Sequence, residues 1–313
     1  MINRLLIALI SIVFLTSSCS KQAYVFTSFH EPANAGLRML YSKDGYKWTD
    51  FNRIFMKPEI GDQKIMRDPS MVQGPDGTFH LVWTTGWRGT KGFGYASSKD
   101  LINWSPQRSI DVMKHEPATV NVWAPEIFYD DEDNQFIIIW ASTIPHRFPR
   151  GVEDESNNHR MYYVTTKDFQ TFSETKLFLD PGFSVIDAVI AKLEKGKYVL
   201  VLKDNTRPNR YMRIAYSDKA TGPYTGVTDA VTDILTEGPS VVKVKDQWLM
   251  YYDAYGDKTY KALGTQDFKK FVDASSRLSI PEGHKHGTIV PVPQRLIKKI
   301  IKDSGREIIE NEK

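Results

Sequence analysis

The stretch Ser98-Lys99-Asp100-Leu101-Ile102-Asn103-Trp104 is one copy of a pattern that occurs five times in this 313-residue chain. In each copy a Ser or Thr is followed closely by Asp and then by an aromatic residue. The other copies are Ser42–Trp48, Thr166–Phe172, Ser217–Tyr224 and Thr265–Phe271. Their aspartates lie 49 to 68 residues apart, the length of a four-stranded propeller blade with its loops. The repeat therefore predicts an all-β fold, a five-bladed β-propeller.

Pairs of strand-like segments lie ahead of the later copies, and turn residues separate the two members of each pair. The pairs are 78–85 with 92–97, 136–141 with 160–165, 197–202 with 211–216, and 247–253 with 259–264. The copy itself is expected to close the third strand of a blade and to begin the fourth.

The two ends of the chain are predicted to share one blade. Only two strand candidates, 23–29 and 36–41, precede the first copy, and 287–293 is a lone strand with no copy after it. Joined, they complete a blade and remove the exposed sheet edges. We therefore expect the propeller at 23–293 and a basic tail at 294–313, helical and packed on the surface at 295–302.

Composition supports a β fold and argues against a nucleic-acid partner. The chain has 16 Phe, 15 Tyr and 7 Trp, residues that favour strands. Its 41 basic and 38 acidic residues give a net charge of +3, and no long basic block is interleaved with aromatics. We expect a monomer.

The first 18 residues are typical of a cleaved signal peptide, with Arg4 ahead of an apolar run too short to span a bilayer. The segment ends in Ser17-Ser18-Cys19 and resembles a bacterial lipobox, although Thr16 stands where Leu is usual. We expect an exported lipoprotein, acylated at Cys19, at the periplasm or cell surface. Its membrane contact would then be through that lipid alone. Cys19 is the single cysteine, so an intramolecular disulfide is excluded.

Acidic residues occur near the start of four of the five expected inner strands, which line the channel of a propeller. They stand in Arg67-Asp68-Pro69, Trp123-Ala124-Pro125-Glu126, Ile186-Asp187-Ala188 and Glu237-Gly238-Pro239, and the fifth start reads His286-Gly287-Thr288. Gathered carboxylates raise one another's pKa and are costly unless chemistry, a cation or hydrogen bonds use them. Singly, each acid has a structural alternative, such as a turn at Asp68 or a hydrogen-bonding strut at Glu126. Their corresponding positions in the blades strengthen the functional interpretation.

These motifs, in this order and with blade-like spacing, resemble glycoside hydrolase family 43 over nearly the whole mature chain. The resemblance implies an inverting glycosidase with Asp68 as general base, Glu237 as general acid and Asp187 as the acid that tunes and orients Glu237. An inverting enzyme needs such a pair about 6.5–9.5 Å apart, so that a water fits between base and sugar. Because Asp187 would repel a second negative charge, we expect a raised pKa at Glu237.

Further residues are candidates for binding. Trp87, Trp123 and Phe183 are placed to stack on a sugar, although each could pack between blades, and Arg67, Arg213 and Glu126 are candidate hydroxyl ligands. Many family members hold a metal ion or water with a histidine near the axis, which His286 matches by position; a core histidine without an ion is an equal alternative. No cofactor is required on this interpretation, and a bound ion would be calcium.

The leading hypothesis is an exported, inverting α-L-arabinofuranosidase or β-D-xylosidase that acts on plant-type oligo- or polysaccharides. An exo-β-1,3-galactosidase of the same fold and a non-catalytic carbohydrate-binding propeller are the alternatives. Loops 85–91 and 144–159 are expected to form walls of the site, and these walls would decide which sugar is cleaved and whether cleavage is exo or endo.

Overall fold

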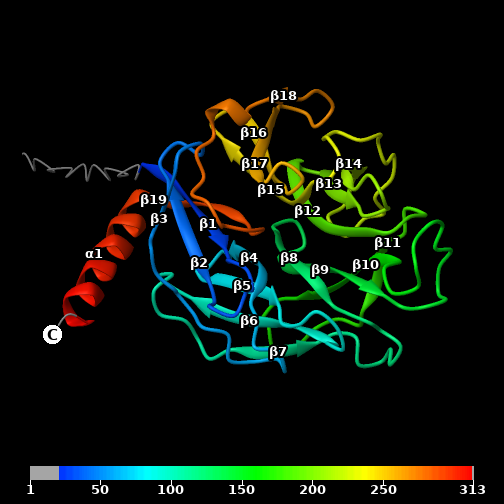
Figure 1. The fold of residues 1–313 in the computed structure, drawn as a ribbon, viewed down its shortest axis with the longest axis horizontal. Helices are drawn as coiled ribbons and strands as arrows, with labels where there is room; N and C mark the ends of the chain where they lie inside the picture. Colours follow the sequence, from blue (N-terminus) through cyan, green and yellow to red (C-terminus); the bar gives the residue numbers. More distant parts are fainter. Residues whose placement is uncertain (1–20, 312–313) are drawn as a thin grey trace, which may run out of the picture.

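The structure is a computed structural model that describes residues 21–311, so the predicted signal peptide and Cys19 lie outside the described residues. Five small antiparallel sheets surround a central axis as the blades of a propeller (Figure 1), which confirms the predicted fold class. Blade 1 consists of β4 (Arg67–Gln73), β5 (Phe79–Thr84), β6 (Gly92–Ser98) and β7 (Arg108–Asp111). Blade 2 consists of β8 (Trp123–Asp130), β9 (Gln135–Thr143), β10 (His159–Thr166) and β11 (Lys176–Leu179).

The next two blades follow in chain order. Blade 3 contains β12 (Val185–Glu194), β13 (Lys197–Asp204) and β14 (Tyr211–Ser217). Blade 4 contains β15 (Glu237–Val244), β16 (Gln247–Ala254), β17 (Thr259–Thr265) and β18 (Val272–Asp273), followed by the short 3₁₀ helix Ser275–Arg277. In blade 3 a single bridge between Tyr216 and Thr225 stands where the other blades have a fourth strand, because the repeat copy there departs from the pattern.

Blade 5 is built from both ends of the chain, as predicted. Its order is β19 (Ile289–Pro293), β1 (Gln22–Ser28), β2 (Arg38–Ser42) and β3 (Trp48–Asp50). Strand β19 pairs antiparallel with β1 over five residue pairs, from Gln22 opposite Pro293 to Phe26 opposite Ile289. Backbone hydrogen bonds between the first and the last strand of the chain thus close the ring of blades.

Main hydrophobic clusters lie between neighbouring blades, one at each of the five interfaces. Strand β9 shows why its sequence is a continuous apolar run. Ile137, Ile139 and Ala141 pack toward blade 3, whereas Ile138 and Trp140 pack toward blade 1. Since side chains alternate between the two faces of a strand, a blade covered on both sides needs apolar residues at every position.

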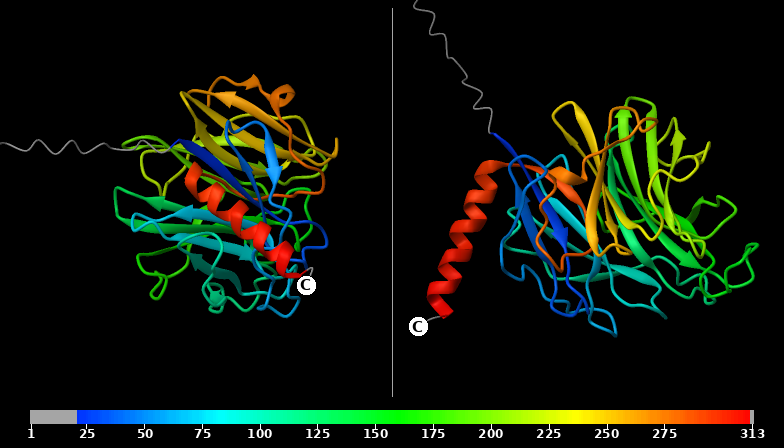
Figure 2. Two further views of the ribbon diagram at one scale, coloured as in Figure 1. Left: turned by 90° about the vertical axis from the view of Figure 1, so that its left-hand side faces the viewer. Right: turned by 45° about the horizontal axis from the view of Figure 1, so that its top comes forward.

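The helix α1 (Gln294–Asn311) follows directly from β19 and lies on the outside of the propeller (Figures 1 and 2). Ile297 and Ile300 are buried in the cluster between blades 5 and 1. Ion pairs from Asp303 to Arg53 (2.8 Å) and from Lys299 to Asp100 (2.8 Å) flank that contact. The helix is longer than the predicted 295–302, and among the described residues no helix is long and apolar enough to cross a membrane.

The repeat copies form the turns between the third and fourth strands. In the copy at Thr166, the hydroxyl oxygen accepts a hydrogen bond from the backbone N–H of Phe169 (2.9 Å), and Asp168 accepts from Gln170 (2.8 Å) and Thr171 (2.9 Å). The left-handed backbone of Phe169 (φ 56°) is held by burial of its ring. Corresponding bonds occur in the copies at Ser42, Ser98 and Thr265.

Replacement of Thr166 by Val should lower the free energy of unfolding by about 1–3 kcal/mol, because the substitution keeps the shape but leaves buried backbone groups unpaired. Thr166→Val and the wild type should be compared by urea unfolding. The matched control is Thr165→Val, since the Thr165 hydroxyl makes no hydrogen bond in the described part of the chain. Equal stabilities of the two variants would contradict a structural role for the repeat.

Candidate active site

The inner strands begin with the same distortion in four blades. The pairing register shifts between Arg67 and Ser70, between Trp123 and Glu126, between Ile186 and Val189, and between Glu237 and Ser240. Within each bulge one residue has left-handed backbone: Asp68 (φ 50°), Ala124 (45°), Asp187 (48°) or Gly238 (59°). Bulges re-aim side chains and are frequent beside active sites.

The bulges correct one detail of the sequence interpretation. Asp68 and Asp187 occupy the left-handed position itself, whereas Glu237 stands one residue earlier in its blade, and Glu126 two residues after Ala124. The acids are therefore not at a single repeated position. They still converge, because Asp68, Asp187 and Glu237 all line one pocket of about 300 Å³ at the axis.

Asp68 is held by one group from β5 and one from the segment that precedes β19. Its Oδ2 accepts a hydrogen bond from the Thr84 hydroxyl (2.9 Å), and its Oδ1 lies 3.3 Å from His286 Nδ1. Burial acts to raise the pKa of Asp68, but His286, Arg67 and Thr84 outweigh it, so the pKa lies below its usual value. Asp68 is thus an ionised carboxylate with its orientation fixed, as a general base requires.

Glu237 forms an ion pair that the sequence did not reveal. Its Oε2 lies 2.9 Å from Nζ of Lys203, whose side chain is 2% exposed. Burial acts to raise the pKa of Glu237, but Lys203 outweighs it and lowers the pKa. The expectation of a raised pKa at Glu237 is therefore wrong for the free protein. That expectation rested on repulsion by Asp187 and did not include the ion pair with Lys203.

Asp187 has the raised pKa instead. Its carboxyl is buried, and its Oδ2 accepts a hydrogen bond from the backbone N–H of Gly238 (3.2 Å). Burial raises the pKa of Asp187, and repulsion by Glu237 and Asp68 adds to this effect. Through Gly238, Asp187 also fixes the backbone next to Glu237, so it contacts the segment that it was predicted to orient.

His286 lies among the three carboxyl groups. Burial acts to lower the pKa of His286, but Asp187, Asp68 and Glu237 outweigh it and raise the pKa to about 9. The ring is therefore an imidazolium that pairs with Asp68. Calcium near His286 stays a prediction.

Trp87 and Trp123 form one wall of the pocket, and both come from the predicted aromatic set. Nε1 of Trp123 donates to the backbone oxygen of Trp87 (2.8 Å), while Trp87 remains 48% exposed. The Arg67 guanidinium lies 4.0 Å from the Trp87 ring centroid and pairs with Glu31 (2.6 Å). Trp87 thus offers an aromatic surface at the mouth, while Arg67 is already engaged.

Three predicted binding residues lie outside the lining of this pocket. Glu126 is half-buried, its Oε2 accepts from the Thr288 hydroxyl (3.2 Å), and burial raises its pKa to about 7. Arg213 pairs with Asp204 (3.0 Å) and lies over the ring of Phe183, so these two side chains stabilise blade 3.

Several lining residues were not predicted: Thr84, Asn157, Lys203, Asn205 and Arg210. Lys203 follows the apolar run 198–202 and pairs in register with Ile186. A charged residue at the end of a buried strand was therefore the sequence feature that could have identified it as a pocket residue. Asn157 belongs to the loop 144–159 that was expected to form a wall. Arg210 presents a guanidinium whose buried Nε has no hydrogen-bond partner among the described residues.

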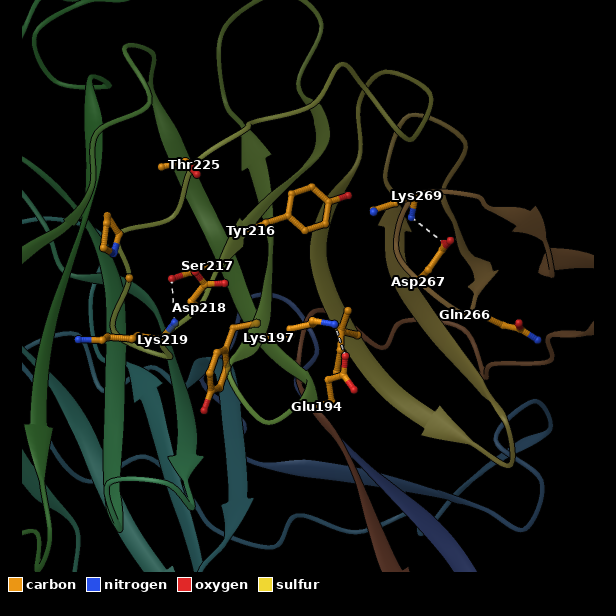
Figure 3. Close-up of a pocket in the computed structure, with 14 residues that line it drawn as sticks. Glu194, Lys197, Tyr216, Ser217, Asp218, Lys219, Thr225, Gln266, Asp267 and Lys269 are labelled. Carbon is orange, nitrogen blue, oxygen red and sulfur yellow. Dashed lines mark hydrogen bonds and ion pairs between the residues drawn. The ribbon is translucent and has the colours of Figure 1, made fainter.

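A larger hollow of about 1,020 Å³ lies elsewhere, between blades 3 and 4. Figure 3 shows Glu194 paired with Lys197, and Asp267 accepting from the backbone of Lys269. Glu194 and Lys197 are both more than 60% exposed, so water solvates them. The smaller axial pocket is the candidate active site because it alone of the two buries interacting carboxyl groups.

Comparison with known proteins identifies a family. A family model described as a probable glycosyl hydrolase domain, of the type related to glycoside hydrolase family 43, matches residues 20–297. A curated α-L-arabinofuranosidase from Bifidobacterium longum is 28% identical over 105 residues, which cover 31% of this chain and only 10% of that relative's length.

Two solved structures share the fold at low sequence identity. An α-L-arabinofuranosidase from Clostridium thermocellum is 15% identical, with a TM-score of 0.56 over 87% of this chain and 91% of the other. An α-L-arabinanase from Cellvibrio cellulosa, complexed with arabinohexaose, is 14% identical, with a TM-score of 0.56 over 82% and 93% of the two chains.

Lys203→Met should raise the pKa of Glu237 by about 1–3 units, because the substitution removes the cation that favours the carboxylate and retains the length of the side chain. The shift can be followed by carbon NMR titration of labelled carboxyl groups, with Glu237→Gln used to assign the resonance. The exposed Lys176→Met is the matched control and should leave the titration unchanged. A pKa of Glu237 that is unaltered by Lys203→Met would refute the electrostatic account.

Proposed function

The chain belongs to the glycosyl hydrolase domains related to glycoside hydrolase family 43, and on this basis we propose that it removes terminal α-L-arabinofuranosyl residues from oligo- or polysaccharides. The observation that carries the proposal is the meeting of Asp68, Asp187 and Glu237 in one small axial pocket. Two carboxyl groups with separate protonation states are what an inverting hydrolase requires.

In the proposed reaction, ionised Asp68 accepts a proton from a water that attacks the anomeric carbon. Protonated Glu237 donates its proton to the departing glycosidic oxygen, and the bond from the anomeric carbon to that oxygen breaks. One water is consumed, and the released sugar has the opposite anomeric configuration. Asp187 holds the backbone beside Glu237, and His286 keeps Asp68 ionised and oriented.

Lys203 gives this mechanism a definite pH dependence. The general acid must carry a proton, yet Lys203 lowers the pKa of Glu237 in the free protein. The reactive form, with Asp68 ionised and Glu237 protonated, is therefore favoured at acidic pH, and it is lost as the pH rises through the pKa of Glu237. The pKa of Asp68 is lowered as well, so activity should also fall at still lower pH, where the base takes up a proton.

The size of the pocket supports exo action. A volume of about 300 Å³ is at the lower end for ligand pockets, which suits one terminal sugar with part of the next. The exposed ring of Trp87 offers a stacking surface for the apolar face of a sugar, and the guanidinium of Arg210, which lines the same pocket, suits its hydroxyl groups. Arabinose is the proposed sugar because the curated relative in sequence is an α-L-arabinofuranosidase.

The purified protein should release nitrophenol from nitrophenyl α-L-arabinofuranoside faster than from the β-xyloside or the β-galactoside. Proton NMR of the first turnovers should show the β-anomer of arabinose before mutarotation. Faster release from the β-xyloside or the β-galactoside would replace the proposed sugar and leave the mechanism standing. Absence of turnover of all three, and of arabino-oligosaccharides, would contradict the proposed function.

Asp68→Asn should lower kcat by about 10²–10⁴-fold, because the water loses its general base. Substrate binding, measured by calorimetry with an oligosaccharide, should persist. Asp62→Asn removes an exposed carboxylate near the same strand and should retain full activity. If Asp68→Asn keeps wild-type kcat, Asp68 is not the base.

We also propose that the chain is exported and anchored by a lipid on Cys19. The support is the sequence alone: an apolar leader that ends in Ser17-Ser18-Cys19. Expressed in a bacterium fed with radiolabelled palmitate, the wild type should carry label in the membrane fraction, whereas Cys19→Ser should carry none. Equal labelling of the two proteins would rule out this site of acylation.

A further inference from the structure

Two histidines and one aspartate meet in blade 5, apart from the carboxyl groups of the active site. His30 follows the end of β1, Asp50 ends β3, and His284 lies in the segment that leads to β19. One ligand atom from each of these side chains lies within 4.8 Å of the other two. The two imidazole rings are edge to face, with centroids 4.5 Å apart.

Ser28 and Asp50 lie against the two nitrogens of His284. Ser28 Oγ is 2.9 Å from the backbone oxygen of Lys285, to which its hydroxyl can donate, and 3.0 Å from His284 Nδ1. When the hydroxyl donates to Lys285, Nδ1 of His284 donates to Ser28, and the lone pair of Nε2 faces Asp50 Oδ2 at 3.0 Å. A lone pair and a carboxylate in that position repel each other unless a cation lies between them.

His30 supplies the second observation. Its Nε2 is buried and has no hydrogen-bond partner among the described residues. A proton between His284 and Asp50 would satisfy those two groups and would leave His30 unpaired. A metal ion would satisfy all three. Gly283 allows this packing, since a Cβ at that position would lie 3.3 Å from the His30 ring.

We propose that His30, Asp50 and His284 form a site for a divalent transition metal of the zinc type. Two imidazole nitrogens and one carboxylate oxygen are a donor set that zinc prefers, and the Nδ1–H bond to Ser28 is the outer contact that metal-bound histidines usually make. Tetrahedral zinc needs ligand atoms about 3.3 Å apart, so side-chain rotations of about 1 Å complete the site.

A hollow beside His284 would supply the fourth ligand. His284 and Gly283 line a hollow of about 410 Å³ whose other wall includes Asp253 and Tyr260. Three protein ligands leave one position for a water from this hollow. Arg38 is the opposing charge, since it acts on both His30 and Asp50. Arg38→Gln should therefore tighten metal binding.

The bound metal would stabilise blade 5, which closes the ring. Its ligands come from the end of β1, the end of β3 and the segment before β19, so the metal joins the N-terminal and C-terminal parts of the chain. The backbone bond from Lys285 N–H to Phe29 O (2.9 Å) already connects the same segments. Because metal binds the folded ring and not the unfolded chain, zinc should raise the melting temperature.

The test uses Strep-tagged protein, stripped with EDTA and titrated with zinc chloride in competition with a chromophoric chelator. We expect one zinc per chain, with calcium and magnesium binding far more weakly. His30→Gln and Asp50→Asn should weaken zinc binding more than 10-fold, and Ser28→Ala should weaken it about 10- to 100-fold. The control, His115→Gln, removes an exposed histidine and should bind zinc as the wild type does.

Absence of saturable zinc binding by the wild type would overturn the proposal and leave a proton between His284 and Asp50. Equal affinities of His30→Gln and His115→Gln would overturn it as well. If the ligand variants fail to fold, the wild type loaded with cobalt decides the matter. An intense visible spectrum supports a site with nitrogen ligands of low coordination number, and the pale spectrum of six-coordinate cobalt contradicts it.

Discussion

The left-handed residue inside the bulge at the start of four of the inner strands is the constraint on which the site depends. At Asp68 and Asp187 it directs a carboxyl group to the axis, and at Gly238 it brings a backbone N–H to Asp187. Such backbone costs energy in residues other than glycine, so the structure must hold it in place. Blade packing does so, and cross-blade bonds such as Ala124 N–H to Thr84 Oγ1 (2.8 Å) add to it.

Electrostatics then separates Asp187 from Asp68 and Glu237. Asp68 faces the imidazolium of His286, and Glu237 faces Lys203. Asp187 is buried and forms no salt bridge with any of the described residues. The pKa values of the first two fall and that of the third rises. Lys203 and His286 thus supply positive charge that allows three carboxyl groups to share about 300 Å³.

The sequence predicted the fold well because a propeller repeats local signals. The Ser98 and Thr166 copies are local turns that specify themselves through neighbouring hydrogen bonds, and runs such as 136–141 show burial on both faces. Asp68, Asp187 and Glu237 were found from their places near strand starts. Lys203 was missed because its partner lies on another blade, and Arg213 was misplaced because Asp204 and Phe183 hold it away from the axis. Such contacts depend on which side chains the folded ring brings together.

In the proposed mechanism, Glu237 delivers the proton to the leaving group and Asp68 does not. The most direct measurement is the rate of Glu237→Gln against aryl arabinofuranosides whose leaving phenols span a range of acidity. If Glu237 is the acid, the variant should lose most activity on poor leaving groups and retain it on dinitrophenolate, which needs no proton. Asp68→Asn should be slow on all of them. A uniform loss in Glu237→Gln across the series would contradict the account.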